Sequence, residues 1–115
     1  MVVDDEVAVL HIARLALERV GHQVVTAESG DEAFRKAALM ECVDVLIVDH
    51  KMPADRGCDL AASLSRLHPA MKVMHMSGWH RDQVEAAGSL MPGSTMLEKP
   101  FTVQQLRNAV TALLA

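Results

Sequence analysis

The stretch 43-VDVLIVD-49 decides how this chain folds. It is apolar except for Asp44, and it ends in the carboxylate of Asp49. A run this short and this rich in Val and Ile is typical of a strand buried on both faces, as in the centre of a parallel sheet covered by helices. Ligands of such sheets bind beyond the carboxyl ends of the strands. We therefore expect Asp49 to lie at the chemically useful edge of the sheet.

The composition indicates one small globular domain. The chain has 115 residues, 50% of them hydrophobic, and we expect residues 1–115 to form a single domain around one core. The net charge of −4, without any cluster of Lys or Arg, argues against direct nucleic-acid binding. We find no apolar run of membrane-spanning length and no signal peptide, so we expect a cytoplasmic location. Cys42 and Cys58 have no CxxC spacing, and we expect them to be reduced packing residues.

Strand and helix patterns alternate five times along the sequence. Short apolar segments predict strands over residues 1–3, 22–27, 43–49, 71–76 and 94–98. Helical spacing, caps and breakers predict helices over residues 7–20, 29–40, 60–67, 81–87 and 102–114. With short, right-handed connections, this alternation gives an α/β sandwich with a parallel sheet.

The ends of the predicted strands deliver polar side chains to one edge of the sheet. These are three carboxylates, one hydroxyl and one ammonium: Asp4 and Asp5, Asp49, Ser77, and Lys99. Each has an ordinary local explanation; the acids at positions 4 to 6, for example, could merely cap the first helix. Five such coincidences on one side of a sheet are much less probable than a functional site.

With these residues in place, the whole chain resembles the receiver domain of two-component response regulators. The motifs that carry the resemblance are Asp4-Asp5, Asp49 followed by Lys51-Met52-Pro53 and Gly57, Ser77-Gly78, and Lys99-Pro100-Phe101. The resemblance implies a flavodoxin-like (βα)5 three-layer sandwich with a five-stranded parallel sheet of order 2-1-3-4-5. It also suggests a cis peptide bond between Lys99 and Pro100.

The chemistry of the carboxylates agrees with a metal site. Carboxylates held close together repel one another unless a cation is present, and Mg²⁺ prefers oxygen ligands. The resemblance implies that Asp5, Asp49 and the backbone carbonyl of Lys51 ligate Mg²⁺ (or Mn²⁺), while Asp4 acts through a water molecule.

The same resemblance implies that Asp49 accepts a phosphoryl group from a phosphohistidine. The donor would be a histidine kinase or a histidine phosphotransfer protein, and the chain would be a signalling phosphoacceptor, not an enzyme in its own right. Lys99 would neutralise the phosphoryl charge, and the Ser77 hydroxyl would contact the group.

Phosphorylation should switch a protein-interaction surface of the domain between two conformations. In many receiver domains, the movement of the residue equivalent to Ser77 is coupled to an aromatic residue three positions before the lysine. This chain has Met96 at that position. Trp79 is expected to take part instead, or else to pack as an ordinary loop residue. The resemblance places the output surface, and the contact of a homodimer, on residues 81–87, 94–98 and 102–114.

Three alternatives stay open at this point. The chain could be the receiver module of a hybrid histidine kinase, present here as a fragment. A small phosphatase with an aspartyl nucleophile would normally carry a second acid two residues after Asp49, where this chain has Lys51. A pseudo-receiver that only binds a protein would not need all of the acids, the serine and the lysine.

Overall fold

A parallel sheet forms the middle layer of the computed structural model, which describes residues 1–50, 57–78 and 93–115. Its five strands are β1 (Val2–Val3), β2 (Thr26–Ala27), β3 (Val45–Asp49), β4 (Lys72–Ser77) and β5 (Thr95–Glu98). They are ordered β2-β1-β3-β4-β5, and every neighbouring pair is parallel. The predicted strand order is therefore confirmed.

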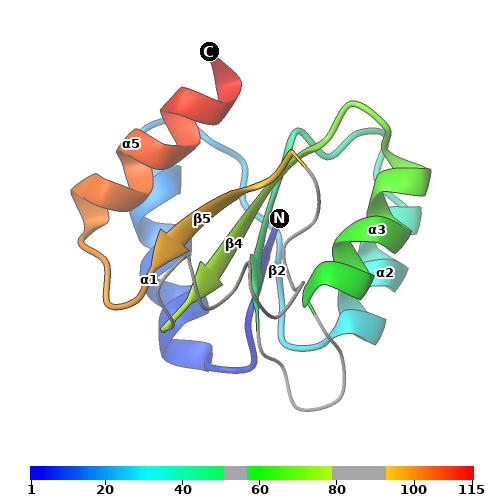
Figure 1. The fold of residues 1–115 in the computed structure, drawn as a ribbon, viewed down its shortest axis with the longest axis horizontal. Helices are drawn as coiled ribbons and strands as arrows, with labels where there is room; N and C mark the ends of the chain where they lie inside the picture. The colour runs from blue at the N-terminus through cyan, green and yellow to red at the C-terminus, as the bar shows by residue number, and fades with distance from the viewer. Residues whose placement is uncertain (51–56, 79–92) are drawn as a thin grey trace.

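Helices cover both faces of this sheet. They are α1 (Val7–Glu18), α2 (Gly30–Ala38), α3 (Gly57–Leu67) and α5 (Val103–Leu114). α1 and α5 lie on one face, and α2 and α3 on the other, which gives the predicted three layers (Figure 1). The helix expected over residues 81–87 lies outside the described residues. None of the described helices is long and apolar enough to cross a membrane.

The core consists of two apolar clusters separated by the sheet. All five residues of β3 are buried, because Val45 and Ile47 face α1 and α5 whereas Leu46 and Val48 face α2 and α3. This two-sided burial explains why the sequence of β3 does not alternate between apolar and polar residues. It also fixes the end of the strand firmly, and Asp49 is at that end.

The helix ends follow the capping signals in the sequence. The Thr102 hydroxyl accepts a hydrogen bond from the Gln105 backbone N–H at 3.1 Å, and the Gln105 side chain accepts one from the Thr102 N–H at 2.8 Å, a complete capping box. The Ser29 hydroxyl accepts from the backbone N–H of Glu32 at 3.2 Å. After α1, Gly21 adopts a φ of 94°, a conformation that favours glycine and turns the chain toward β2.

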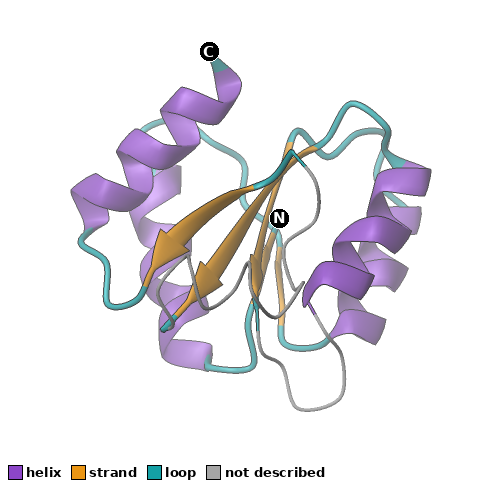
Figure 2. Cartoon of the chain, in the orientation of Figure 1, coloured by secondary structure: helices purple, strands orange, loops and turns teal. Residues whose placement is uncertain are grey.

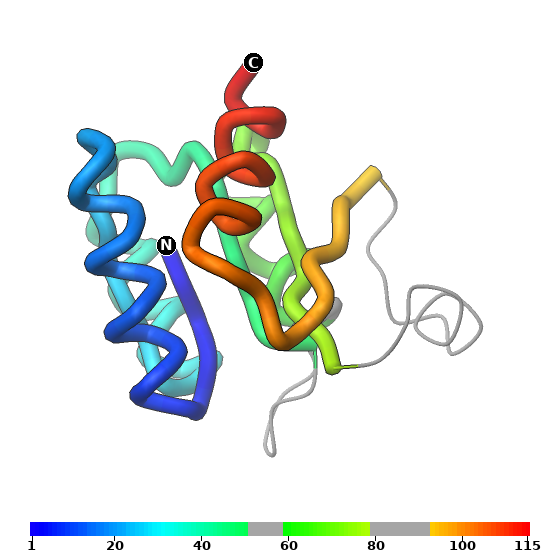
Figure 3. Tube along the Cα trace, turned by 90° about the vertical axis from the view of Figure 1, so that its left-hand side faces the viewer, coloured from blue at the N-terminus to red at the C-terminus, as the bar shows by residue number. Residues whose placement is uncertain are grey.

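The carboxyl ends of all the strands meet at one edge of the sheet. The arrowheads in Figure 2 point to this edge, from which the loops toward the helices depart. Viewed from the side, α1 and α5 lie in front of the sheet (Figure 3). The two helices are joined by a hydrogen bond of 2.9 Å from the Arg107 side chain of α5 to the Ala16 carbonyl of α1.

The prediction of a strand over residues 22–27 was too long, because β2 contains only Thr26 and Ala27. β2 is the edge strand beside β1, and β1 is itself only two residues long. Val25 still accepts a hydrogen bond from the Val2 N–H at 2.9 Å, but the residues before it have no strand partner to continue the ladder.

Candidate functional site

Asp49 ends the central strand and is nearly buried, with 7% of its surface exposed. It is opposite Met76 of β4, and the next residue, His50, donates its backbone N–H to the Met76 carbonyl at 2.8 Å. Pairing therefore continues one residue beyond the carboxylate. β4 thus pairs with the chain before and after Asp49, so the side chain has a fixed place at the edge of the sheet.

Asp4 and Asp5 follow β1 and reach the same edge in different environments. Asp4 is completely buried and Asp5 is exposed. One carboxylate oxygen of Asp4 accepts a hydrogen bond from the Glu6 backbone N–H at 2.9 Å. Carboxylate oxygens of Asp4, Asp5 and Asp49 all lie within 4.8 Å of one another. The structure thus brings the three predicted acids together.

Lys99 enters this acidic cluster from β5. Its backbone N–H donates to the Ser77 carbonyl at 2.7 Å, and the peptide bond to Pro100 is cis, as predicted. The Nζ atom is 2.8 Å from Asp4 Oδ2 and 3.5 Å from Asp49 Oδ1. Although burial alone would lower it, the pKa of Lys99 is raised above its usual value by the hydrogen bond to Asp4 and by the neighbouring negative charges. Lys99 is therefore a firmly charged ammonium.

Ser77 and Met96 occupy neighbouring strands. Ser77 is the last residue of β4 and is buried, in register with Glu98 of β5. Met96 is half-buried in β5, in register with His75 of β4. The other two residues predicted for the site or its switch, Lys51 and Trp79, lie outside the described residues.

Sequence reasoning missed two features of this region. The Glu6 carboxylate lies 3.8 Å from Lys99 Nζ, whereas the sequence suggested at most a helix cap. His75 is completely buried in β4, although the sequence gave no reason to separate it from the other histidines. Its apolar neighbours along β4 were the available signal, since they predict a central strand. Burial, with a smaller effect of the nearby His50, lowers the pKa of His75 to about 4.

The buried His75 should make the fold sensitive to acid. Its pKa of about 4 lies below the usual value of 6.5. Well above pH 6.5 both the folded and unfolded chains hold it neutral, so it has no effect on stability there. As the pH falls toward 4, the unfolded chain gains a proton that the folded chain does not. The free energy of unfolding should fall by about 3 kcal/mol over this interval.

Urea unfolding at pH 7 and pH 4.5 measures this effect. His75→Gln, which does not titrate, should lose less stability between the two pH values than the wild-type chain. His11→Gln, a change on the exposed surface of α1, should retain the wild-type loss. An equal loss in the His75 variant would show that other groups cause the acid sensitivity.

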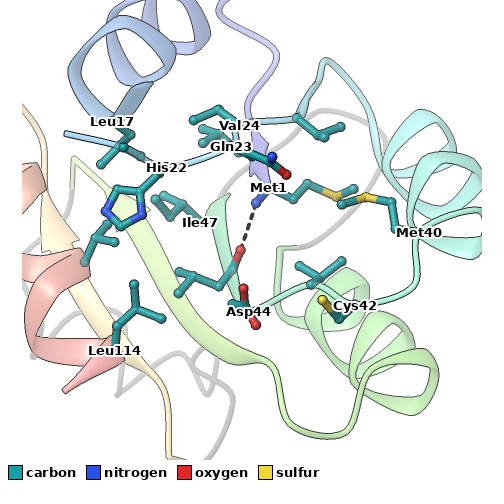
Figure 4. Close-up of a pocket in the computed structure, with 16 residues that line it drawn as sticks. Met1, Leu17, His22, Gln23, Val24, Met40, Cys42, Asp44, Ile47 and Leu114 are labelled. Carbon is teal, nitrogen blue, oxygen red and sulfur yellow. Dashed lines mark hydrogen bonds between the residues drawn. The ribbon is translucent and has the colours of Figure 1, made fainter. Parts of the chain in front are cut away.

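The opposite edge of the sheet has a cavity of about 430 Å³ that is separate from the acidic cluster. Met1, Met40 and Cys42 are among the residues that line it, and the Met1 amino group donates to the Val45 carbonyl at 2.8 Å (Figure 4). None of the predicted site residues that the structure describes lines this cavity. Cys42 is exposed, so its prediction as a packing residue was wrong; it precedes β3 and lies outside the sheet.

The donor atoms at the carboxyl edge fit a hard divalent cation. Three carboxylates supply oxygen ligands of the kind that Mg²⁺ prefers. Both oxygens of Asp4 already accept hydrogen bonds, from the Glu6 N–H and from Lys99, which leaves Asp5 and Asp49 better placed for direct ligation. The half-buried ammonium of Lys99 beside them can stabilise an anion that arrives at Asp49.

Comparison with known proteins identifies relatives of this arrangement. The family model of the response regulator receiver domain matches residues 1–111. The alkaline phosphatase synthesis transcriptional regulatory protein PhoP of Bacillus subtilis is 26% identical over 99% of this chain, which spans 47% of that protein. The sensor kinase CckA of Brucella abortus is 33% identical over 99% of this chain, which spans only 12% of it.

A solved structure agrees with the sequence relatives. The response regulator receiver domain protein from Clostridium thermocellum superimposes with a TM-score of 0.82 at 32% identity, and the match covers 98% of this chain and 90% of that one. The family match spans nearly the whole chain, and the acids, serine and lysine that suggested it lie at one edge of the sheet. This chain therefore belongs to the response regulator receiver domain family of two-component systems.

Proposed function

We propose that Asp49 is the phosphoacceptor of this receiver domain and takes its phosphoryl group from a phosphohistidine of a histidine kinase or histidine phosphotransfer protein. The observation that carries the proposal is the placement of the Asp49 carboxylate, buried at the end of the central strand, 3.5 Å from the Lys99 ammonium and beside two further acids. The chain itself is a signalling phosphoacceptor in this proposal.

The reaction requires one nucleophile and several charge-stabilising groups. An oxygen of Asp49 attacks phosphorus, the bond from phosphorus to the imidazole nitrogen breaks, and the imidazole leaves with the electron pair. The product is an acyl phosphate. Lys99 neutralises charge on the equatorial oxygens, and the Ser77 hydroxyl donates a hydrogen bond to one of them. These residues mainly position the group, because phosphoryl transfer needs little covalent help from the protein.

Mg²⁺ (or Mn²⁺) is the proposed cofactor. Asp5 and Asp49 would hold it together with the backbone carbonyl of Lys51, and Asp4 would reach it through a water molecule. The bound ion supplies positive charge against the phosphoryl oxygens. Asp4 contributes in another way, since it orients the Lys99 ammonium through a 2.8 Å ion pair.

Phosphorylation would then change the surface near β4 and β5. A phosphoryl group adds nearly two negative charges, which attract the Ser77 hydroxyl and the Lys99 ammonium. Their backbones are joined by the 2.7 Å hydrogen bond from the Lys99 N–H to the Ser77 carbonyl, so the two would respond together. Met96 repacks beside them in this proposal, and Trp79 takes part in the rearrangement. A homodimer contact over residues 81–87, 94–98 and 102–114 remains a prediction.

We also propose that this domain is part of a longer signalling protein. The chain spans 47% of PhoP and 12% of the sensor kinase CckA, so in both relatives the matched segment is only part of the protein. The similarity to CckA supports the receiver module of a hybrid histidine kinase, and the similarity to PhoP supports the receiver of a transcriptional regulator. We propose a cytoplasmic location for the domain in either setting.

Incubation with acetyl phosphate and Mg²⁺, followed by intact-mass measurement, tests the proposal. A receiver domain gains the mass of one phosphoryl group, and EDTA prevents the gain. Continuous release of phosphate without a stable adduct would indicate a phosphatase, and absence of any adduct would indicate a pseudo-receiver. Peptide mapping after reduction of the acyl phosphate with borohydride should locate the group at Asp49.

Mg²⁺ should stabilise the folded chain through Asp5. At ten times its Kd the ion adds about 1.4 kcal/mol to the free energy of unfolding, which raises the Tm by several degrees. Asp5→Asn should abolish most of this rise and should slightly stabilise the metal-free protein, because one of three crowded charges is gone. Thermal melts with and without Mg²⁺ measure both effects. Asp31→Asn, at the start of α2, is the control and should keep the full response.

A further inference from the structure

Glu6 places a carboxylate at the outer end of the site. Its side chain is 65% exposed, whereas that of Lys99 is 19% exposed and that of Asp4 is fully buried. Glu6 Oε1 lies 3.8 Å from Lys99 Nζ. The ammonium is therefore surrounded by acids at three depths, with Asp4 innermost, Asp49 next and Glu6 facing the solvent.

Side-chain capping does not account for a glutamate at this position, although the helix dipole favours a negative charge there. Glu6 is the N-cap residue of α1, a position that favours the short side chains of Ser, Thr, Asp and Asn. Its side chain makes no capping hydrogen bond, and the first turn of α1 contains no acidic residue. A residue that breaks the capping preference suggests that its side chain serves another purpose. Here the side chain lies toward Lys99 instead of capping the helix.

The charge balance of the site gives Glu6 a physical effect. Among the described residues, Asp4, Glu6 and Asp49 have carboxylate oxygens within 4.0 Å of the Lys99 ammonium, and Asp5 lies beside Asp4 and Asp49. Two of these acids are the proposed metal ligands, and Asp4 is paired with Lys99 inside the fold. Glu6 is therefore an exposed negative charge beside Lys99 that is neither a proposed metal ligand nor buried in an ion pair.

We propose that Glu6 is a specificity-determining residue. Its exposed carboxylate repels small, highly charged phosphodonors, and it holds the Lys99 ammonium in place until the phosphoryl group arrives. This inference rests on the proposed function of Asp49. With acetyl phosphate, the bond from Asp49 oxygen to phosphorus forms, the bond from phosphorus to the acetyl oxygen breaks, and acetate leaves with the electron pair. A donor protein that docks on the domain overcomes the repulsion through its own binding contacts, whereas a small free anion has no such contacts.

The discrimination should depend on the charge of the donor. A unit charge about 5 to 10 Å away in water changes the local concentration of a singly charged ion by roughly two- to fourfold. Acetyl phosphate is a dianion at pH 7, and phosphoramidate carries less net negative charge. For Glu6→Gln at low ionic strength, we expect phosphorylation to be about five- to tenfold faster with acetyl phosphate and only about two- to threefold faster with phosphoramidate.

The experiment compares the wild-type chain, Glu6→Gln and Glu41→Gln with both donors in the presence of Mg²⁺. Glu41 is exposed and precedes β3 at the opposite edge of the sheet, so its variant has the same net charge but an unchanged site. Intact mass follows the rate of phosphorylation. In about 1 M salt, where the Debye length is about 3 Å, the advantage of Glu6→Gln should largely disappear.

A second measurement detects the contact between Glu6 and Lys99 in the absence of phosphoryl transfer. Glu6 Oε1 lies 3.8 Å from Lys99 Nζ, so loss of its charge changes the electric field at the ammonium. At pH 7, the NMR chemical shift of the Lys99 ammonium should change in Glu6→Gln and stay unchanged in Glu41→Gln. A purely structural role of Glu6 at the start of α1 would not produce this pattern.

The outcomes separate the inference from the function on which it rests. If the wild-type chain forms an adduct but Glu6→Gln changes the rates with both donors equally, or changes neither, the specificity role is wrong and the function of Asp49 stands. If the wild-type chain forms no adduct with either donor, the proposed function and the role of Glu6 are both wrong. If Glu6→Gln and Glu41→Gln accelerated phosphorylation equally, the effect would come from the net charge of the protein, and the specificity role of Glu6 would be wrong.

Discussion

Asp49→Asn should lower phosphoryl incorporation from acetyl phosphate to below detection while the chain stays folded. Asparagine has nearly the same shape as aspartate and keeps one oxygen, but its neutral amide is a poor nucleophile toward phosphorus. The other two acids of the cluster cannot replace it, because Asp4 is bonded to Lys99 and to the Glu6 N–H, and Asp5 is exposed at the end of β1. Intact mass after incubation with donor and Mg²⁺ measures the loss.

The matched control is Asp44→Asn, one residue before the same strand. Asp44 is exposed at the other end of β3, so this variant makes the same chemical change away from the site. It should incorporate phosphoryl at the wild-type rate. Normal incorporation in the Asp49 variant would mean that a different residue is the acceptor.

Lys99→Met should damage both phosphorylation and stability. Methionine keeps the length and the apolar body of the lysine side chain but removes its charge. Loss of one charged donor to the reacting group costs about 10² to 10³ in rate. Asp4 is fully buried and loses its 2.8 Å ion pair, and a buried charge left without its partner typically costs about 3 kcal/mol. Rates from intact mass and urea unfolding measure the two effects.

Two further variants identify the cause of each loss. Lys72→Met makes the same change at the start of β4, where the residue is exposed, and should leave both properties nearly unchanged. The double variant Asp4→Asn, Lys99→Met removes the uncompensated buried charge and should recover much of the stability, but none of the rate. If the double variant were no more stable than Lys99→Met, the ion pair would not be the source of the lost stability.

Most of the fold could be predicted because burial on both faces leaves a clear pattern. β3 is apolar at successive positions, and the polar residues after each strand marked where the strands end. The ends of the edge strand β2 could not be predicted from such a pattern. The residues before Thr26 have strand-like composition, but the length of β2 depends on its pairing with the short β1, which is a tertiary property.

The site could be predicted as a set of residues but not as a geometry. Sequence spacing placed Asp4 and Asp5 at the same edge, yet only the structure separates a buried acid that binds Lys99 from an exposed one. The contact between Glu6 and Lys99 joins residues that follow the first and the last strand, so no local pattern contains it. The environment of His75 likewise depends on which face of β4 the surrounding helices cover.

The unequal burial of Asp4 and Asp5 has a consequence for the mutational tolerance of the domain. Substitutions at Asp4 alter a fully buried ion pair and should be depleted from a variant library even when the library is selected only for soluble expression. Substitutions at Asp5 alter an exposed side chain, so they should survive that selection and be lost only when signalling is required. Two adjacent, chemically identical residues should thus be held in place by different selective pressures, one acting on folding and the other on phosphoryl transfer.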